Sequence, residues 1–458
     1  MNRDSPVPGF TRRELLAYLA GVPLAGLVGC TNGGNLAFGG ELLNPDFSVG
    51  HRLRDGWRPP EPISPPSAHQ VVIVGAGIAG LSAAWQLERL GIDDFVILES
   101  GNQAGGTSLG GQLGEFRFPW GAHYVPTPMP ENEDLIAFFE QMGVIEGRSD
   151  RGDPIVAEQF LCREPEERVW AGRQWIQGLY PDAAASDEDR GQLERFRRLI
   201  DEWAGRSDPS GRRMFAIPMS TGSDCEEVRL LDGMSMDQWM GEHNFTSAPL
   251  LWLVDYACRD DYGLTIRQTS AWAGLYYFAS RLRGDGSQSQ DVITWPEGNF
   301  RIVRYLADQF GDRVKCSQTV TEITDVGGDV LRVRAYGTDS STTRDYHASD
   351  VIFAAPQFLA PHIISQWAQN GRSVKSFRYG GWVVANVAIR DRPIESGLGM
   401  CWDNVIMDSP SLGYVVSTHQ TGRDHGATVL TWYHPKMDED PRVSRGDLMR
   451  LGWSDWAR

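Results

Sequence analysis

Apolar and polar positions divide the chain into stretches with strand-like and helix-like spacing. A continuous apolar run at 71–74 predicts a buried parallel strand, and the periodic apolar residues at 81–91 predict a helix directly after it. A second apolar run at 95–98 predicts another buried strand. Strand, turn, helix and strand in this order indicate an α/β fold built on a parallel sheet.

The spacing changes twice further along the chain. From about 132 to 290 the pattern is mostly helical, with helices expected at 134–143, 187–203 and 235–241. After that stretch, β-branched residues again recur in a strand-like pattern. They predict strands at 320–323, 330–333, 351–356, 379–390 and 412–433. This order predicts a nucleotide-binding domain interleaved with a substrate domain that contains a mixed sheet and helices.

The length of 458 residues exceeds what one hydrophobic core usually supports. We therefore divide the chain into a signal at 1–30, a Gly/Pro-rich tether at 31–68, a nucleotide-binding part at 69–130, a helical substrate-domain insertion at 131–292, a second nucleotide-binding part at 293–358, and a substrate-domain sheet at 359–458.

The N-terminal residues have the pattern of an export signal. Arg12 and Arg13 precede an apolar run at 15–29, which is too short to span a bilayer and fits a twin-arginine signal. The four residues ending at Cys30 resemble a lipoprotein cleavage site, so we expect an exported periplasmic or cell-envelope protein whose membrane contact is a lipid at Cys30. The alternative is an amphipathic helix with a chance arginine pair. No later apolar stretch predicts a transmembrane helix.

Composition narrows the classes of partner. The chain has 60 acidic and 43 basic residues and a formal charge of −17, which repels nucleic-acid phosphates and mildly favours cationic small molecules. A merely solubilising surface explains the charge equally well. The histidines form no HxH or HExxH pattern and the cysteines no CxxC, so no metal site is expected.

The strongest motif is the glycine-rich turn between the first strand and helix, Gly75-Ala76-Gly77-Ile78-Ala79-Gly80. Gly75 permits the tight turn, Gly77 lets a pyrophosphate approach the backbone, and Gly80 lets the helix pack closely on the sheet. Glu99 follows the second strand, 19 residues past Gly80, where a carboxylate can bind both hydroxyls of an adenosine ribose. The turn therefore predicts a dinucleotide site.

The chain contains one GxGxxG motif, which predicts one bound dinucleotide. The glycine-rich stretch at 100–106 could pass along a long cofactor, but spacing alone leaves FAD and NAD open.

Together with downstream motifs, the turn resembles the FAD-dependent family of flavin amine oxidases and phytoene-desaturase-like proteins. The resemblance covers about 69 to 435 and rests on the turn, Glu99, Gly105-Gly106, Gly121-Ala122-His123-Tyr124, Trp295-Pro296-Glu297-Gly298-Asn299, Val320-Thr321-Glu322-Ile323 and 351–356. It implies a Rossmann-like, three-layer FAD-binding domain, FAD held without a covalent bond, and a mixed-sheet substrate domain above the flavin.

The resemblance also implies roles for single residues. The glycine turn and the doublet Gly105-Gly106 would hold the pyrophosphate region, Glu99 the ribose, and the backbone of Val320 the adenine edge. Gly121, Ala122 and His123 would pass beside the flavin ring. The alternatives are an ordinary strand residue for Val320 and a loop histidine without chemical role for His123.

Three features depart from the family pattern. Thr107 follows the glycine doublet where the family commonly has Arg, and Lys375 is a poor match to the lysine that many amine oxidases place near flavin N5. The family also ends in a glycine-rich segment that closes over the pyrophosphate, and 359–458 contains none. We expect either that the sequence is incomplete or that the product lacks part of its cofactor site.

The implied activity is hydride transfer from a small molecule to flavin N5, with an amine slightly favoured and dioxygen or an envelope electron carrier as acceptor. Aromatic faces bind cations, and the candidates for such a pocket are Trp382, Trp402, Tyr414, Trp432 and Tyr433. No catalytic residue is assigned. The alternatives are a lipid desaturase or isomerase, a non-catalytic envelope lipoprotein of the same fold, and an NAD-dependent dehydrogenase.

Overall fold

The computed structural model describes residues 39–43, 47–182, 185–282, 291–375, 377–393, 397–438 and 440–456. The expected signal at 1–30, with Arg12, Arg13 and Cys30, lies outside these residues and stays a prediction. Among the described residues, no helix combines the length and apolarity needed to cross a bilayer.

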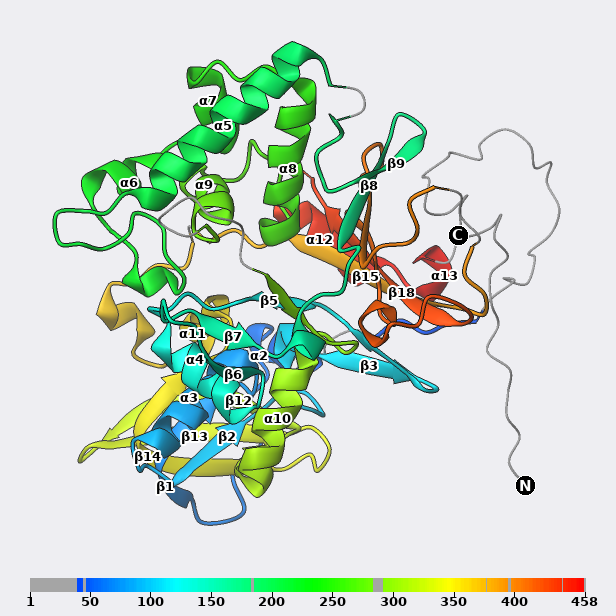
Figure 1. Cartoon of the computed structure of the whole chain (residues 1–458). Coiled ribbons are helices and arrows are strands. Elements are labelled where there is room, and N and C mark those ends of the chain that lie inside the picture. The colour runs from blue at the N-terminus through cyan, green and yellow to red at the C-terminus, as the bar shows by residue number, and fades with distance from the viewer. Residues whose placement is uncertain are drawn as a thin grey trace, which may run out of the picture.

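A six-stranded sheet forms the nucleotide-binding part, lower left in Figure 1. Its strands in spatial order are β11 (Val314–Lys315), β2 (Phe95–Leu98), β1 (Ser67–Val74), β14 (Thr343–Phe353), β13 (Val330–Gly337) and β12 (Gln318–Gly327). The first four strands are parallel, and β13 and β12 continue the sheet antiparallel. The expected α/β fold with a Rossmann-like parallel sheet is confirmed.

Both faces of this sheet are covered, which explains why its central strands are continuously apolar. On one face lie α3 (Ile78–Arg89) and α10 (Phe300–Phe310), which share a core with Ile73 and Ile97. The short helix α11 (Ala360–Ile363) packs on the other face, where Val72 and Val96 are buried. The layers are therefore helix, sheet and helix, in agreement with the three layers that the family resemblance implies.

A second six-stranded sheet forms the substrate part. Its strands in spatial order are β15 (Gly381–Ile389), β18 (Thr428–Lys436), β17 (Gly413–Val416), β16 (Asp403–Ile406), β8 (Glu167–Ala171) and β9 (Gln174–Gln177). The β16–β8 pair is parallel and the others are antiparallel, so the sheet is mixed.

Strands β8 and β9 correct the mostly helical expectation for 132–290, as does the hairpin of β6 (Ile145–Arg148) and β7 (Pro154–Val156). These strands are short, and β8 pairs with β16, which lies far away in sequence. Local periodicity carries no information about a partner so distant, which is why the pattern missed them.

The helices expected at 134–143, 187–203 and 235–241 are present in the structure. Five helices of the insertion lie together in the upper part of Figure 1. They are α5 (Asp187–Gly205), α6 (Glu226–Leu231), α7 (Met236–Glu242), α8 (Ala248–Tyr262) and α9 (Ala271–Ala279), which share one buried core. The other elements of five or more residues are α2 (Ser48–Arg54), α4 (Glu133–Gln141) and α12 (Pro441–Arg450), and the shorter ones include β3 (Gly110–Leu113), β4 (Phe116–Pro119), β5 (Tyr124–Pro126), β10 (Val292–Thr294) and α13 (Trp453–Trp456).

Part of the predicted tether is folded against the first sheet. The Arg52 guanidinium lies 3.7 Å from the centre of the Trp57 ring, and this ring meets the edge of Tyr336 on β13 at 5.1 Å. Glu61 forms an ion pair with Arg334 at 3.1 Å. The Gly/Pro-rich composition suggested an extended arm, but these contacts place 52–61 against the sheet.

We predict that Trp57→Ala lowers the free energy of unfolding by about 1–3 kcal/mol, because a half-buried indole loses its contacts with Arg52 and Tyr336. Ile63→Ala is the matched control, since Ile63 is 84% exposed and a surface change costs less than about 0.5 kcal/mol. Chemical denaturation measures both. Equal stability of the two variants would show that 48–61 is only loosely attached.

Candidate functional site

The glycine turn leaves an open approach to the first turn of α3. A Cβ added to Gly80 would lie 1.9 Å from the carbonyl oxygen of Gly75, so the helix packs against the turn at backbone distance. A Cβ added to Gly77 would meet nothing within 4 Å, and no side chain caps the helix at Gly77. Free N–H groups and open space at a helix N-terminus suit an anionic pyrophosphate.

The doublet Gly105-Gly106 forms a second wall of this space. The Gly105 N–H donates to the carbonyl of Ala76 at 2.9 Å, and Gly105 forms an isolated bridge with Gly77. A Cβ added to Gly106 would lie 3.5 Å from the Cα of Gly77. The structure therefore brings the two glycine motifs together as one cradle of bare backbone, which we call the glycine cradle (75–80 with 105–106).

Glu99 lies at the end of β2 beside the glycine cradle. Its two carboxylate oxygens accept hydrogen bonds from the Ala76 N–H at 2.8 Å and the Gly101 N–H at 2.7 Å. A carboxylate has about four acceptor positions, so these bonds fix its direction and leave positions for ribose hydroxyls. The geometry fits the predicted role of Glu99.

Val320 reaches the same end of the sheet. The Gln318 N–H donates to the Glu99 carbonyl at 2.7 Å, which places the start of β12 next to Glu99. The Val320 side chain is buried in the core on the other face of the sheet, so a contact with adenine would involve its backbone. That contact stays a prediction.

Backbone packing also connects the glycine cradle to the segment 121–123. A Cβ added to Gly121 would lie 2.2 Å from the carbonyl oxygen of Thr107, and the Ala122 N–H donates to the same oxygen at 3.2 Å. The Asn299 N–H donates to the Ala122 carbonyl at 3.1 Å. Thr107, which stands where the family commonly has Arg, thus contacts this segment through its backbone carbonyl.

His123 lies in an aromatic cluster. Its ring centre is 5.0 Å from that of Tyr433, 5.2 Å from Trp402 and 5.2 Å from Tyr124, and the Tyr433 hydroxyl donates to the Gly121 carbonyl at 2.9 Å. Burial lowers the pKa of His123 to about 4, so the imidazole is neutral at pH 7. A neutral ring does not repel a cation that enters the cluster.

Strand alternation decides which predicted aromatic residues belong to this cluster. Trp382 and Trp402 share a core with Tyr433 on the same face of the second sheet. Tyr414 and Trp432 are cross-strand partners packed in a separate core, so their expected place in the pocket is wrong. Lys375 is exposed, in agreement with its poor match to the family's lysine.

Three carboxyl groups that sequence reasoning missed lie beside the aromatic cluster: Asp260, Asp403 and Glu167. Burial, with repulsion by Asp261, raises the pKa of Asp260 to about 7, and burial with repulsion by Glu166 and Asp260 raises that of Glu167 to about 7. Burial, with repulsion by Asp260 and Glu167, raises the pKa of Asp403 well above its usual range. The one available signal was that an acid, Asp403, directly follows Trp402, one of the aromatic residues expected in the pocket.

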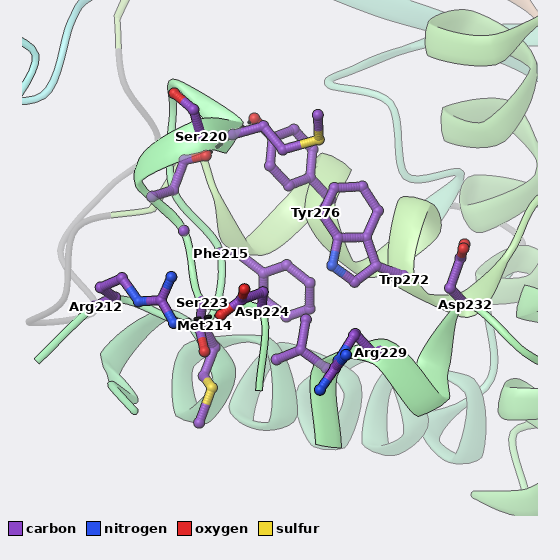
Figure 2. A pocket seen from close by; sticks show the side chains of 14 residues that line it. Arg212, Met214, Phe215, Ser220, Ser223, Asp224, Arg229, Asp232, Trp272 and Tyr276 are labelled. Carbon is purple, nitrogen blue, oxygen red and sulfur yellow. Dashed lines mark hydrogen bonds and ion pairs between the residues drawn. The ribbon is translucent and has the colours of Figure 1, made fainter. Parts of the chain in front are cut away.

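A separate hollow of about 500 Å³ lies among the helices and is shown in Figure 2. Phe215, Trp272 and Tyr276 form its apolar side, and an ion pair between Arg212 and Asp224 borders it. None of its lining residues belongs to the glycine cradle or the aromatic cluster, so we do not assign it to the candidate site.

Comparison with known proteins agrees with this geometry. Residues 73–142 match the family described as NAD(P)-binding Rossmann-like domain. The protein AofH of Mycobacterium tuberculosis, described provisionally as a flavin-containing monoamine oxidase, is 25% identical over 278 residues, which are 58% of this chain and 54% of AofH. A FAD-binding monooxygenase of Hypomyces subiculosus, hmp7, is 48% identical over 61 residues, 13% of this chain and 10% of hmp7. The chain thus spans about half the length of AofH.

Solved structures share the fold across most of the chain. Putrescine oxidase bound to putrescine aligns with a TM-score of 0.59 and 16% identity, over 85% of this chain and 79% of that one. Cyclohexylamine oxidase from Brevibacterium oxydans aligns with a TM-score of 0.53 and 14% identity, over 85% and 78% of the two chains. A fatty acid isomerase from P. acnes also aligns at 0.53 and 14%, over 83% and 81%. The chain therefore shares the fold of these proteins.

We predict that Gly77→Val folds normally but loses its bound dinucleotide. The backbone of Gly77 has φ −74° and ψ 179°, which any residue adopts, and the added side chain would project into the open cradle. Gly80→Val is the matched control: its Cβ would clash with the carbonyl of Gly75, and unfolding should become easier by about 1–3 kcal/mol. Cofactor content and thermal unfolding measure the two effects. A Gly77→Val protein that retains its cofactor would contradict the assignment of the cradle.

Proposed function

We propose that this chain is a FAD-dependent oxidoreductase that oxidises a small amine. One arrangement carries the proposal: Thr107, which directly follows the open glycine cradle, accepts a backbone hydrogen bond from Ala122, and the next residue is the neutral His123 inside an aromatic cluster. A dinucleotide held in the cradle and extended toward 121–123 would place its reactive end beside these aromatic rings.

The residues present fit FAD. The first turn of α3 at Gly77 would bind the pyrophosphate and Glu99 the ribose, while Gly121, Ala122 and His123 would lie beside the ring system. FAD supplies the hydride acceptor when bound. The protein's part is to hold the substrate C–H bond in place and to exclude water, which the packed rings of Tyr124, Trp402 and Tyr433 favour.

An amine is the substrate that the side chains favour. Tyr and Trp faces attract ammonium groups, and the carboxyl groups of Asp260, Asp403 and Glu167 lie beside them. The likeness to AofH, putrescine oxidase and cyclohexylamine oxidase supports the same choice. Dioxygen or an electron carrier of the cell envelope would take the electrons.

Isomerisation or desaturation of a lipid is the second candidate, and the fold shared with a fatty acid isomerase supports it. The partly buried carboxyl groups of Asp260, Asp403 and Glu167 disfavour a fatty-acid chain beside the aromatic cluster, because an alkyl chain packed against polar groups leaves them without hydrogen bonds. A non-catalytic protein and an NAD-dependent dehydrogenase predict no flavin chemistry at all.

We also propose export to the periplasm or cell envelope, with a lipid at Cys30. The arginine pair at 12–13 and the apolar run at 15–29 support it. Detection of a lipidated Cys30 by mass spectrometry of the membrane fraction tests the anchor, and an unprocessed cytoplasmic chain would contradict export.

We predict that small alkyl amines bleach the visible absorbance of the flavin-loaded protein when oxygen is excluded, and that readmitted oxygen or an artificial electron acceptor restores it. Oleate is the comparison substrate, because a fatty acid tests the lipid alternative. Bleaching by amines and not by oleate is expected. A flavin that no amine reduces, or an isomerised fatty acid as product, would contradict the proposed activity.

A further inference from the structure

We propose that the folded body of this chain docks on an anionic phospholipid membrane through one basic face, so that it lies on the membrane in a fixed orientation. The basic face consists of residues 372–375 and 377–379, which we call the basic segment, and the outward side of α12. The proposal goes beyond the proposed oxidation of an amine. It takes from the proposed export only the compartment and the position of a lipid at Cys30.

The basic segment lies in the longest stretch of the chain without an acidic residue. Although the chain has 60 acidic residues, none occurs among the 40 residues of 351–390. The same stretch contains Arg372, Lys375, Arg378 and Arg390, and the first three fall within seven positions. A chain with a formal charge of −17 therefore contains one region that is purely basic.

The basic segment presents its charges to solvent together with an aromatic ring. Arg372, Lys375 and Arg378 are exposed, and within the described residues neither Lys375 nor Arg378 forms an ion pair. Phe377, between these two cations, is 54% exposed. At a membrane surface a phenyl ring can enter the apolar boundary while flanking cations stay at the lipid headgroups. The basic segment has this arrangement of side chains.

Helix α12 lies directly beside the basic segment. The Arg445 guanidinium donates a hydrogen bond to the carbonyl of Tyr379, the last residue of the segment. A Cβ added to Gly381, at the start of β15, would lie 3.0 Å from the Cβ of Ser444. The inner side of α12 therefore packs where the basic segment leads into β15, and its outward side adjoins the segment.

The outward side of α12 also combines cations with exposed apolar side chains. Arg442 and Met449 are seven positions apart, as are Val443 and Arg450, and seven positions make about two helical turns. The four side chains therefore share one side of the helix. All four residues are exposed, Val443 by 53% and Met449 by 51%.

The acidic groups around α12 are engaged in ion pairs. Lys436 pairs with Asp438 at 3.0 Å and with Asp447 at 2.9 Å, and Arg442 lies 3.8 Å from Asp440. The negative charges beside the helix are therefore offset locally. The basic segment adds positive charge that no neighbouring acid of this kind offsets.

The N-terminal tether meets the folded body next to this face. Gly40 lies directly against the Trp453 indole, so a side chain at position 40 would overlap with the ring. Trp453 begins α13, just after α12 ends at Arg450. Gly40 is ten residues past Cys30, and ten residues reach at most about 35 Å. A lipid at Cys30 would therefore keep α12 near the membrane.

An anionic bilayer is the partner that these features favour. Lysines and arginines close to such a surface are attracted by the lipid charge over about 8 Å at physiological salt. The remainder of the chain is strongly acidic and is repelled, so the basic face is the one that approaches. An acidic protein would meet the same charges, but the tether brings a membrane, and not a soluble protein, to this side of the molecule.

The first test measures binding of the full chain, without a lipid, to phosphatidylcholine vesicles with and without roughly one-third phosphatidylglycerol. We expect binding to the anionic vesicles that weakens at high salt. The double variant Lys375→Gln with Arg378→Gln should bind them about 10- to 30-fold less tightly, because each cation contributes about a fivefold factor.

Arg197→Gln with Arg198→Gln is the matched control. Both arginines are exposed on α5, which lies at the top of Figure 1, far from α13. The control removes the same charge and should change binding less than about twofold, because these positions are not at the proposed membrane contact. Thermal unfolding shows whether both double variants are folded.

Hydrogen exchange locates the contact and separates it from binding by the apolar run at 15–29. Anionic vesicles should slow exchange in the basic segment and in α12 and leave α5 unchanged, and Phe377→Ser should reduce the protection. Absence of binding, protection confined to residues before 30, or equal losses in the two double variants would overturn the proposal.

These measurements are independent of the other proposals for this chain. A Cys30 without lipid in cells would contradict the proposed anchor, and a flavin that no amine reduces would contradict the proposed oxidation. Neither result would change the binding of the unlipidated chain to vesicles, and a failure to bind vesicles would contradict the basic face alone.

Discussion

Close packing of bare backbone at successive glycine positions holds the candidate site together. Gly80 lies against the Gly75 carbonyl, Gly105 against Ala76, and Gly121 against the Thr107 carbonyl. No side chain beyond hydrogen fits at Gly80 or Gly121 without movement of the backbone. This chain of contacts runs from the dinucleotide cradle to His123, so the position of the aromatic cluster follows from the packing of the first sheet.

The second sheet carries carboxyl groups at positions where they lower the stability of the fold. Asp403 and Glu167 occupy paired positions on a face that is otherwise mostly apolar, and Asp260 lies in the last turn of α8, which packs on it. Apolar residues of similar size would stabilise these positions. Conflicts of this kind between local preference and the fold concentrate at functional sites. The partly buried acids and the neutral histidine thus lie in the same region of the structure.

The first sheet and its glycine cradle could be predicted from sequence because the signals are local. A buried strand, the turn at 75–80, a periodic helix and Glu99 follow one another within about thirty residues, as the βαβ unit requires. The acids could not be predicted, because Glu167, Asp260 and Asp403 lie far apart in sequence and meet only through the β8–β16 pairing and the packing of α8. The same reason explains why Tyr414 and Trp432 were wrongly expected in the aromatic pocket. The face of the sheet on which they lie depends on strand register, which composition does not reveal.

The claim on which the account depends is that the glycine cradle holds one FAD. The most direct measurement is the visible absorbance spectrum of the purified protein, followed by identification and quantification of the cofactor released on denaturation. The account predicts an oxidised-flavin spectrum and one FAD per chain. A folded protein that stays colourless after incubation with FAD, or that binds NADH tightly instead, would contradict it.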